Sequence, residues 1–197
     1  MASRPVSQKN LTIPNLITLI RILLTPVFII CLIQGYYHKA LAIFVLAGLS
    51  DLADGLIARV WHQKSRLGSY LDPLADKVLM AASFLTLSIY REIPPWLTVL
   101  VLSRDVTLGL GVVIFRLADI PLVVRPSLAG KWTTTFQVTT VFLVLVGKIW
   151  PISPSVLMVF FWVTGILTTI SGIHYFYGGI RMMDASYGNG PREDGSG

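Results

Sequence analysis

Six segments of this 197-residue chain are apolar over about 20 residues each, which is the length of an α-helix that crosses a lipid bilayer. They are Ile13–Gly35, Lys39–Trp61, Leu71–Tyr90, Pro95–Arg116, Leu128–Gly147 and Ser155–Phe176. Charged residues make up only 13% of the chain, about half of their share in an average soluble domain. The segments therefore predict an all-α integral membrane protein with six transmembrane helices.

The connections between these segments are too short to hold a second domain. We expect residues 1–12 to form a cytoplasmic N-terminal arm, residues 13–178 a six-helix transmembrane domain, and residues 179–197 a flexible cytoplasmic tail. Cys31 is the only cysteine, so the chain has neither an internal disulfide nor a thiolate metal site.

The basic residues predict how the helices are oriented. With six spans, twelve Lys and Arg residues fall at one set of helix ends and three, Lys39, Arg91 and Lys148, at the opposite ends. Cytoplasmic ends carry such an excess, so both termini are expected in the cytoplasm. Because the net charge of +6 gathers at one membrane face, it favours contact with anionic headgroups and phosphorylated substrates over nucleic acid.

Four carboxylates are concentrated in the 26 residues from Asp51 to Asp76, next to these apolar segments. Asp51 and Asp54 are three residues apart and Asp72 and Asp76 four apart, so each pair lies on one face of its helix. Charges at such positions are costly and normally mark function. Facing pairs would repel unless divalent cations lay between them, and hard oxygen ligands favour Mg²⁺ or Mn²⁺. We therefore predict a metal site between the second and third helices, within the cytoplasmic leaflet.

The spacing of this stretch, D-x2-D-G-x2-A-R-x8-G-x3-D-x3-D, resembles the signature of the CDP-alcohol phosphatidyltransferases, which are membrane enzymes of phospholipid synthesis. All eight fixed residues are present: Asp51, Asp54, Gly55, Ala58, Arg59, Gly68, Asp72 and Asp76. The resemblance implies that an alcohol attacks the β-phosphorus of CDP-diacylglycerol and expels CMP.

The resemblance also implies a role for each aspartate. Asp51, Asp54 and Asp72 would be the primary ligands of two metal ions, with Asp76 completing the arrangement. Asp76 would also act as the general base that takes the proton of the alcohol. The family resemblance further implies a homodimer.

Three residues of the signature are expected to bind the CDP group. A side chain at Gly55 would obstruct the nucleotide, although a glycine here also suits close helix packing. Arg59 can pair with the diphosphate in a forked geometry, or reach from a helix end to the interface. Gly68 resembles the family's second glycine on the cytidine side.

The acceptor is expected to bind at Arg104 and Lys131, in stretches that resemble phosphatidylglycerophosphate synthases and CDP-dependent cardiolipin synthases. The start of the first segment, with Thr18 and Arg21, resembles the same two groups. Arg104 could instead form an internal salt bridge with Asp105, and Thr133, Thr134 and Thr135 could simply bond between helices.

The identity of the acceptor depends on departures from the glycerol-3-phosphate enzymes. Those enzymes usually have Ala-Arg-Glu where this chain has Ser103-Arg104-Asp105, and a further Arg where it has Val112. The differences favour phosphatidylglycerol, and hence cardiolipin as product, with glycerol-3-phosphate as the alternative. An ion-coupled transporter is disfavoured because the acids lie near one surface and no repeat is visible. A bacterial inner membrane is the expected location.

Overall fold

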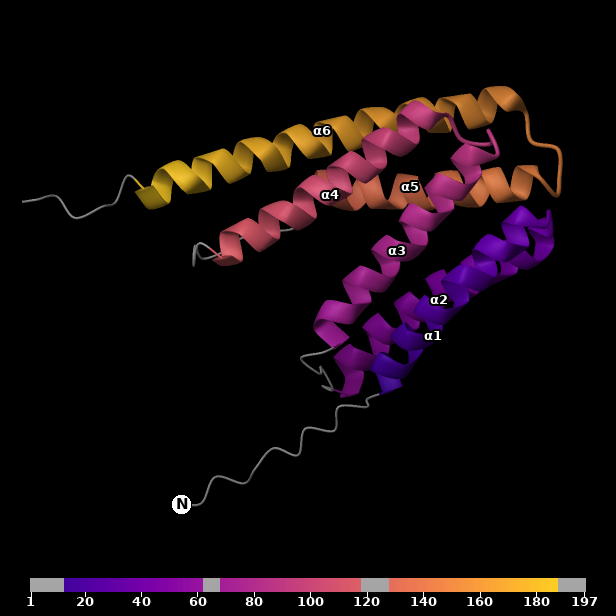
Figure 1. The fold of residues 1–197 in the computed structure, drawn as a ribbon, viewed down its shortest axis with the longest axis horizontal. Coiled ribbons are helices and arrows are strands. Elements are labelled where there is room, and N and C mark those ends of the chain that lie inside the picture. The colour runs from indigo at the N-terminus through magenta and orange to yellow at the C-terminus, as the bar shows by residue number, and fades with distance from the viewer. Residues whose placement is uncertain (1–12, 62–67, 118–127, 188–197) are drawn as a thin grey trace, which may run out of the picture. The chain divides into compact units, whose positions relative to one another are not determined.

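The computed structural model describes residues 13–61, 68–117 and 128–187, and within them every regular element is an α-helix. The helices are α1 (Ile13–Ile33), α2 (Tyr37–Trp61), α3 (Gly68–Ile89), α4 (Pro95–Leu117), α5 (Leu128–Gly147) and α6 (Pro154–Tyr187). The six predicted segments thus correspond one to one with six helices (Figure 1). The prediction of an all-α protein is confirmed for the described part of the chain.

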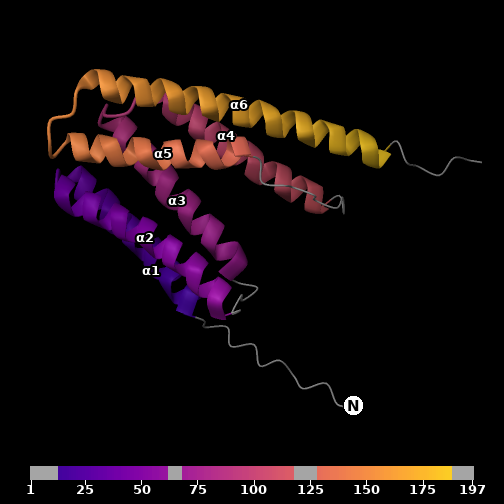
Figure 2. The same cartoon turned by 180° about the vertical axis from the view of Figure 1, so that it is seen from behind.

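The helices belong to two compact units. One unit contains α1, α2, α3 and residues Val141–Ser153, and the other contains α4, the part of α5 up to Thr140, and α6. Figure 2 shows the same helices from behind. Each unit is described by itself below.

In the first unit, α1 packs against both α2 and α3. Its core contains large side chains that are almost fully buried, among them Phe28, Phe44, Phe84 and Leu87. The rings of Phe28 and Phe44 join α1 to α2, with centroids 6.0 Å apart. Arg21, on α1, is buried in the same unit with 1% of its surface exposed.

Two helices of this unit end in the same hydrogen-bonded turn. After α1, the Tyr36 N–H bonds to the carbonyl of Cys31 and the Gly35 N–H to that of Leu32, with Gly35 at φ 73°. After α3, the Glu92 N–H bonds to Leu87 and the Arg91 N–H to Ser88, with Arg91 at φ 61°. This is the left-handed C-terminal cap, which glycine adopts without steric cost and arginine does not.

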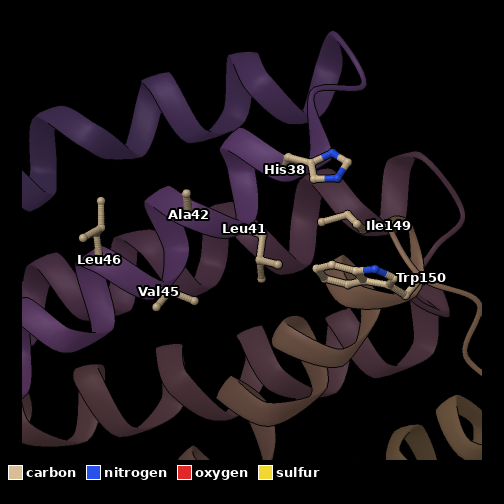
Figure 3. A pocket seen from close by; sticks show the side chains of 7 residues that line it. All are labelled: His38, Leu41, Ala42, Val45, Leu46, Ile149 and Trp150. Carbon is tan, nitrogen blue, oxygen red and sulfur yellow. The ribbon is translucent and has the colours of Figure 1, made fainter.

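A shallow groove runs along the start of α2. It has a volume of about 460 Å³, and Figure 3 shows the side chains that line it: His38, Leu41, Ala42, Val45, Leu46, Ile149 and Trp150. The lining is apolar apart from His38, whose ring meets that of Trp150 edge-on at 6.3 Å. None of the described residues that line the groove carries a carboxylate.

In the second unit, α6 runs beside α4 (Figures 1 and 2). Polar side chains join α6 to α5. Thr133 donates to the Leu167 carbonyl at 3.0 Å, and the hydroxyls of Thr140 and Thr164 lie 2.8 Å apart. Gln137 donates to the Thr168 hydroxyl at 3.4 Å. The alternative role considered for the threonines, hydrogen bonding between helices, is therefore seen at Thr133. Thr134 and Thr135 bond to carbonyls of their own helix.

Along α6, polar side chains are buried and large apolar side chains are exposed. On α6, Thr164, Thr168 and Ser171 are buried, whereas Trp162, Ile166, Ile170, Ile173 and Phe176 are more than half exposed. In water such an apolar outer surface would be costly, but in lipid it is the favourable arrangement. Among the described residues, two segments are long and apolar enough to cross a membrane, Pro95–Phe115 and Pro154–Gly179.

Candidate active site

The predicted carboxylates are carried by two helices of the first unit. Asp51 and Asp54 lie on α2, and Asp72 and Asp76 lie on α3. The third helix begins at Gly68, three residues before the predicted Leu71, so both Asp72 and Asp76 lie within it. All four positions thus lie within helices, and the shared face of each pair stays a prediction from the spacing.

Asp76 is the carboxylate whose surroundings the structure describes. Its Oδ1 accepts a hydrogen bond from Nη1 of Arg21 on α1 at 2.5 Å. The Asp76 side chain is 43% exposed, whereas that of Arg21 is 1% exposed. The buried cation thus fixes one oxygen of a carboxylate whose side chain is partly exposed.

The backbone of α1 at Arg21 accepts one further hydrogen bond. The Thr25 hydroxyl donates to the Arg21 backbone carbonyl at 3.0 Å, one turn further along the helix. A buried guanidinium is strongly disfavoured in an apolar environment unless it is paired. The sequence stretch from Ile13 to Arg21 suggested a family resemblance but gave no partner for Arg21, and Asp76 is that partner.

The surroundings of the other predicted site residues of the first unit lie outside what the structure describes. These residues are Asp51, Asp54, Gly55, Arg59, Gly68 and Asp72. Among the described residues no group of three or more His, Cys, Asp or Glu residues could hold a metal ion. The mutual approach of the two aspartate pairs therefore remains a prediction from their spacing.

The carboxylate donors nevertheless suit a hard divalent cation. Four aspartates supply only oxygen ligands, which Mg²⁺ and Mn²⁺ prefer to nitrogen or sulfur. Asp76, which Arg21 contacts through Oδ1, is the more exposed member of that pair. The donor set thus fits the predicted metal, with Asp51, Asp54, Asp72 and Asp76 as the residues that would hold it.

The residues predicted to bind the acceptor, Arg104 and Lys131, both lie in the second unit. Arg104 on α4 is 8% exposed, and its Nη1 donates to the Asp105 carboxylate at 2.8 Å. Its Nη2 donates to the Ser171 hydroxyl on α6 at 3.0 Å. The internal salt bridge considered from the sequence is therefore present. Lys131 is exposed near the start of α5.

Comparison with known proteins extends these observations. A sequence model described as CDP-alcohol phosphatidyltransferase matches residues 11–170. The match covers five helices and the first half of the sixth, including the whole aspartate stretch. The chain belongs to the CDP-alcohol phosphatidyltransferase family, whose members generally depend on a divalent metal.

Three curated relatives illustrate its neighbours. The chain is 35% identical to "Cardiolipin synthase (CMP-forming)" of Rattus norvegicus, over 84% of this chain and 60% of the relative. It is 35% identical to "Probable phosphatidylglycerophosphate synthase" of Mycobacterium tuberculosis, over 85% of this chain and 84% of the relative. It is 30% identical to "CDP-diacylglycerol--glycerol-3-phosphate 3-phosphatidyltransferase" of Aquifex aeolicus, over 88% of this chain and 98% of the relative.

The chain spans only part of some of these proteins. It matches about three fifths of the length of the animal cardiolipin synthases. Over the aligned residues it is 34–35% identical to them. The relatives' names include both acceptors considered from the sequence.

Proposed function

We propose that this chain transfers the phosphatidyl group of CDP-diacylglycerol to a glycerol-type acceptor and releases CMP. The observation that carries the proposal is the complete eight-residue signature on α2 and α3, with Asp76 fixed by the buried Arg21. An isolated carboxylate cluster could have other uses. A signature of this specificity, in a chain that belongs to the family, supports phosphatidyl transfer.

The roles proposed for the carboxylates follow from the chemistry of the reaction. A divalent cation, Mg²⁺ or Mn²⁺, held by Asp51, Asp54, Asp72 and Asp76 would stabilise negative charge on the diphosphate. Asp76 takes the proton of the acceptor alcohol, which is a poor nucleophile while protonated. Arg21 holds the Asp76 carboxylate in one orientation, so that the proton-accepting oxygen faces the same direction in each turnover.

The CDP group is proposed to bind along α2. Gly55 allows the nucleotide to approach the helix backbone, Arg59 pairs with the diphosphate oxygens, and Gly68 clears space at the start of α3. These three assignments rest on the positions of the residues in the signature.

The membrane arrangement is proposed from the distribution of charge and apolar surface. Six helices would cross the bilayer, with both termini and the aspartates on the cytoplasmic side. The exposed apolar face of α6 and its buried hydroxyls support an environment of lipid. A homodimer in a bacterial inner membrane is part of the same proposal and rests on the family resemblance and the basic residues.

Phosphatidylglycerol is the acceptor that we favour, which makes cardiolipin the product. Glycerol-3-phosphate carries close to two negative charges and calls for several fixed cations. Here the charge of Arg104 is already matched by Asp105 at 2.8 Å, and Val112 stands where the glycerol-3-phosphate enzymes usually have a second Arg. The loss of one charge-assisted hydrogen bond costs about 1.5–3 kcal/mol, or roughly 10- to 150-fold in affinity.

A direct competition tests this choice. Purified protein in detergent is incubated with radiolabelled CDP-diacylglycerol, Mg²⁺ and equal amounts of phosphatidylglycerol and glycerol-3-phosphate, and the products are separated by chromatography. We expect cardiolipin to dominate. If phosphatidylglycerophosphate is the main product, the acceptor is glycerol-3-phosphate and not phosphatidylglycerol. The proposed reaction class would be unaffected. The absence of CMP release with either acceptor would overturn the proposed function.

A further inference from the structure

The Arg104 guanidinium is held by side chains on two helices of the second unit. Asp105, its neighbour on α4, accepts from Nη1 at 2.8 Å, and Ser171 on α6 accepts from Nη2 at 3.0 Å. The ring of Tyr175, one turn beyond Ser171, lies 5.8 Å from the guanidinium carbon. α6 also approaches the arginine stem closely, since a Cβ on Gly172 would lie 3.8 Å from its Cγ.

One N–H donor of this guanidinium makes no hydrogen bond to a described residue. The Nε–H of Arg104 is buried and has no hydrogen-bond partner among the described residues. A buried donor without a partner is costly, and its presence at a residue that is more than nine-tenths buried indicates a place where another group binds. Nε and Nη2 form one edge of the guanidinium, so Ser171 holds the edge on which this donor lies.

The position of Ser171 is itself fixed by α5. Thr164, Thr168 and Ser171 follow each other at intervals of four and three residues, so they share one face of α6. The first two bond to Thr140 and Gln137 of α5, which sets the register of this face. The buried polar side chains on this face of α6 therefore contact α5 at Thr164 and Thr168 and the Arg104 guanidinium at Ser171.

We infer that Ser171 and Tyr175 of α6 are positioning residues that set acceptor affinity through Arg104. The inference rests on the proposed function, in which Arg104 binds the acceptor. Asp105 is adjacent in sequence and accepts from Nη1, whereas Ser171 and Tyr175 are the contacts that α6 makes with the guanidinium. A forked contact with an acceptor oxygen requires a fixed plane, whereas the CDP lipid is bound by other residues.

The test compares Ser171→Ala with the wild-type protein in detergent, with CMP release measured against acceptor and CDP-diacylglycerol concentrations separately. We expect the KM for the acceptor to rise roughly 10-fold, as for one weakened charge-assisted hydrogen bond. kcat and the KM for CDP-diacylglycerol should stay at their wild-type values. Ser171→Thr keeps the hydroxyl and should restore most of the acceptor affinity.

A matched control lies on the same helix. Thr169→Ala removes a hydroxyl that is exposed and bonds only to the Gly165 carbonyl of its own helix, so it should leave the acceptor KM unchanged. If Ser171→Ala does not fold, Tyr175→Leu provides the second variant, because it removes the ring and keeps apolar bulk. A lost cation–π contact predicts an acceptor KM raised about 2- to 30-fold.

Arg104→Gln separates this inference from the proposed function. If Arg104→Gln raises the acceptor KM and adding Ser171→Ala raises it no further, the two residues act as a unit and the inference holds. If Arg104→Gln raises it while Ser171→Ala and Tyr175→Leu do not, the positioning role is wrong and the acceptor site stands. If Arg104→Gln leaves the acceptor KM unchanged, Arg104 does not bind the acceptor. The inference about Ser171 and Tyr175 is then wrong as well.

Discussion

Arg21 and Asp76 are 55 residues apart in the sequence and form an ion pair of 2.5 Å between α1 and α3. The arginine is almost fully buried and the aspartate is partly exposed. The ion pair therefore lies at the boundary between the interior of the first unit and its surface. Asp76 is the last aspartate of the signature and the proposed general base. In the proposed active site, the first helix would therefore contribute through a residue outside the signature.

Replacement of Arg21 should impair turnover more than substrate binding. Without the guanidinium, the Asp76 carboxylate loses its fixed orientation, and misplacement by about 1 Å can cost roughly 100-fold in rate. We expect Arg21→Gln to lower kcat about 10- to 100-fold, with a smaller change in the KM for CDP-diacylglycerol. Arg21→Lys keeps the charge but not the fork, so its kcat should be intermediate.

Thr25→Val is the control for this prediction. Thr25 is buried on the same helix and its hydroxyl bonds to the Arg21 backbone carbonyl, so the change alters α1 without touching the ion pair. Its kcat should stay near the wild-type value. An Arg21→Gln protein with wild-type kcat would show that the pair only stabilises the fold.

The ion pair between Lys148 and Glu92 gives a prediction about pH. Lys148 Nζ lies 2.6 Å from Glu92 Oε1, and this hydrogen bond raises the pKa of Lys148 against the opposing effect of burial. A raised pKa in the folded chain means that the stabilisation is fully present below the ordinary lysine pKa. It is lost as the pH rises through the raised value.

Lys148→Gln should therefore lower the Tm at neutral pH and reduce the loss of Tm at strongly alkaline pH. Because both side chains are about one-quarter to one-third exposed, the pair contributes only about 0.2–1 kcal/mol, or roughly 1–3 °C. Lys39→Gln is the matched control, because it removes a cation–π contact with Tyr36 and no ion pair with a described residue. Equal alkaline sensitivity in Lys148→Gln and the wild type would contradict the prediction.

Two glycines of the second unit should respond oppositely to alanine. A Cβ on Gly165 would lie 2.7 Å from the Trp96 ring, which stacks on Trp162 with centroids 5.0 Å apart. A Cβ on Gly109 of α4 would meet nothing within 4 Å. Gly165→Ala must therefore displace Trp96 and should lower stability by about 1 kcal/mol. Gly109→Ala should raise it by about 0.5–1 kcal/mol, since alanine favours a helix. Thermal unfolding in detergent measures both, and equal shifts would contradict the packing described for Trp96.

The helices were predictable because apolar length is a local property of the sequence. The bounds of α5 agree with the prediction at both ends, and α1 begins at the predicted Ile13. α2 begins two residues before the predicted Lys39. α6 extends to Tyr187, eleven residues beyond the predicted Phe176.

The partners of the site residues were less predictable, because they depend on how helices pack. No local pattern links Arg21 to Asp76 or Arg104 to Ser171, which are 55 and 67 residues apart. The Arg104–Asp105 pair could be considered from the sequence because the two residues are adjacent. The one sequence feature that pointed to the Arg21–Asp76 pair was an Arg within the apolar first segment. A charge buried there requires a partner of opposite charge.

Gly55 provides a test of nucleotide binding. A large side chain on α2 beside Asp54 would occupy the space proposed for the CDP group. Gly55→Leu should therefore lower the affinity for CDP-diacylglycerol at least 10-fold, or about 1.4 kcal/mol. Equilibrium binding of the CDP lipid to purified protein is the measurement, and an unchanged Tm is the control for folding. Normal affinity in a folded Gly55→Leu protein would remove the proposed approach of the nucleotide.

The central claim, metal-dependent phosphatidyl transfer at the aspartates of α2 and α3, is tested most directly by CMP release from CDP-diacylglycerol as Mg²⁺ is varied. The wild-type protein should release CMP with Mg²⁺ and stop when EDTA is added. Asp54→Asn removes a charged ligand and should lower turnover by about two orders of magnitude or more at saturating Mg²⁺. Wild-type turnover in Asp54→Asn, or CMP release that persists in EDTA, would contradict the account.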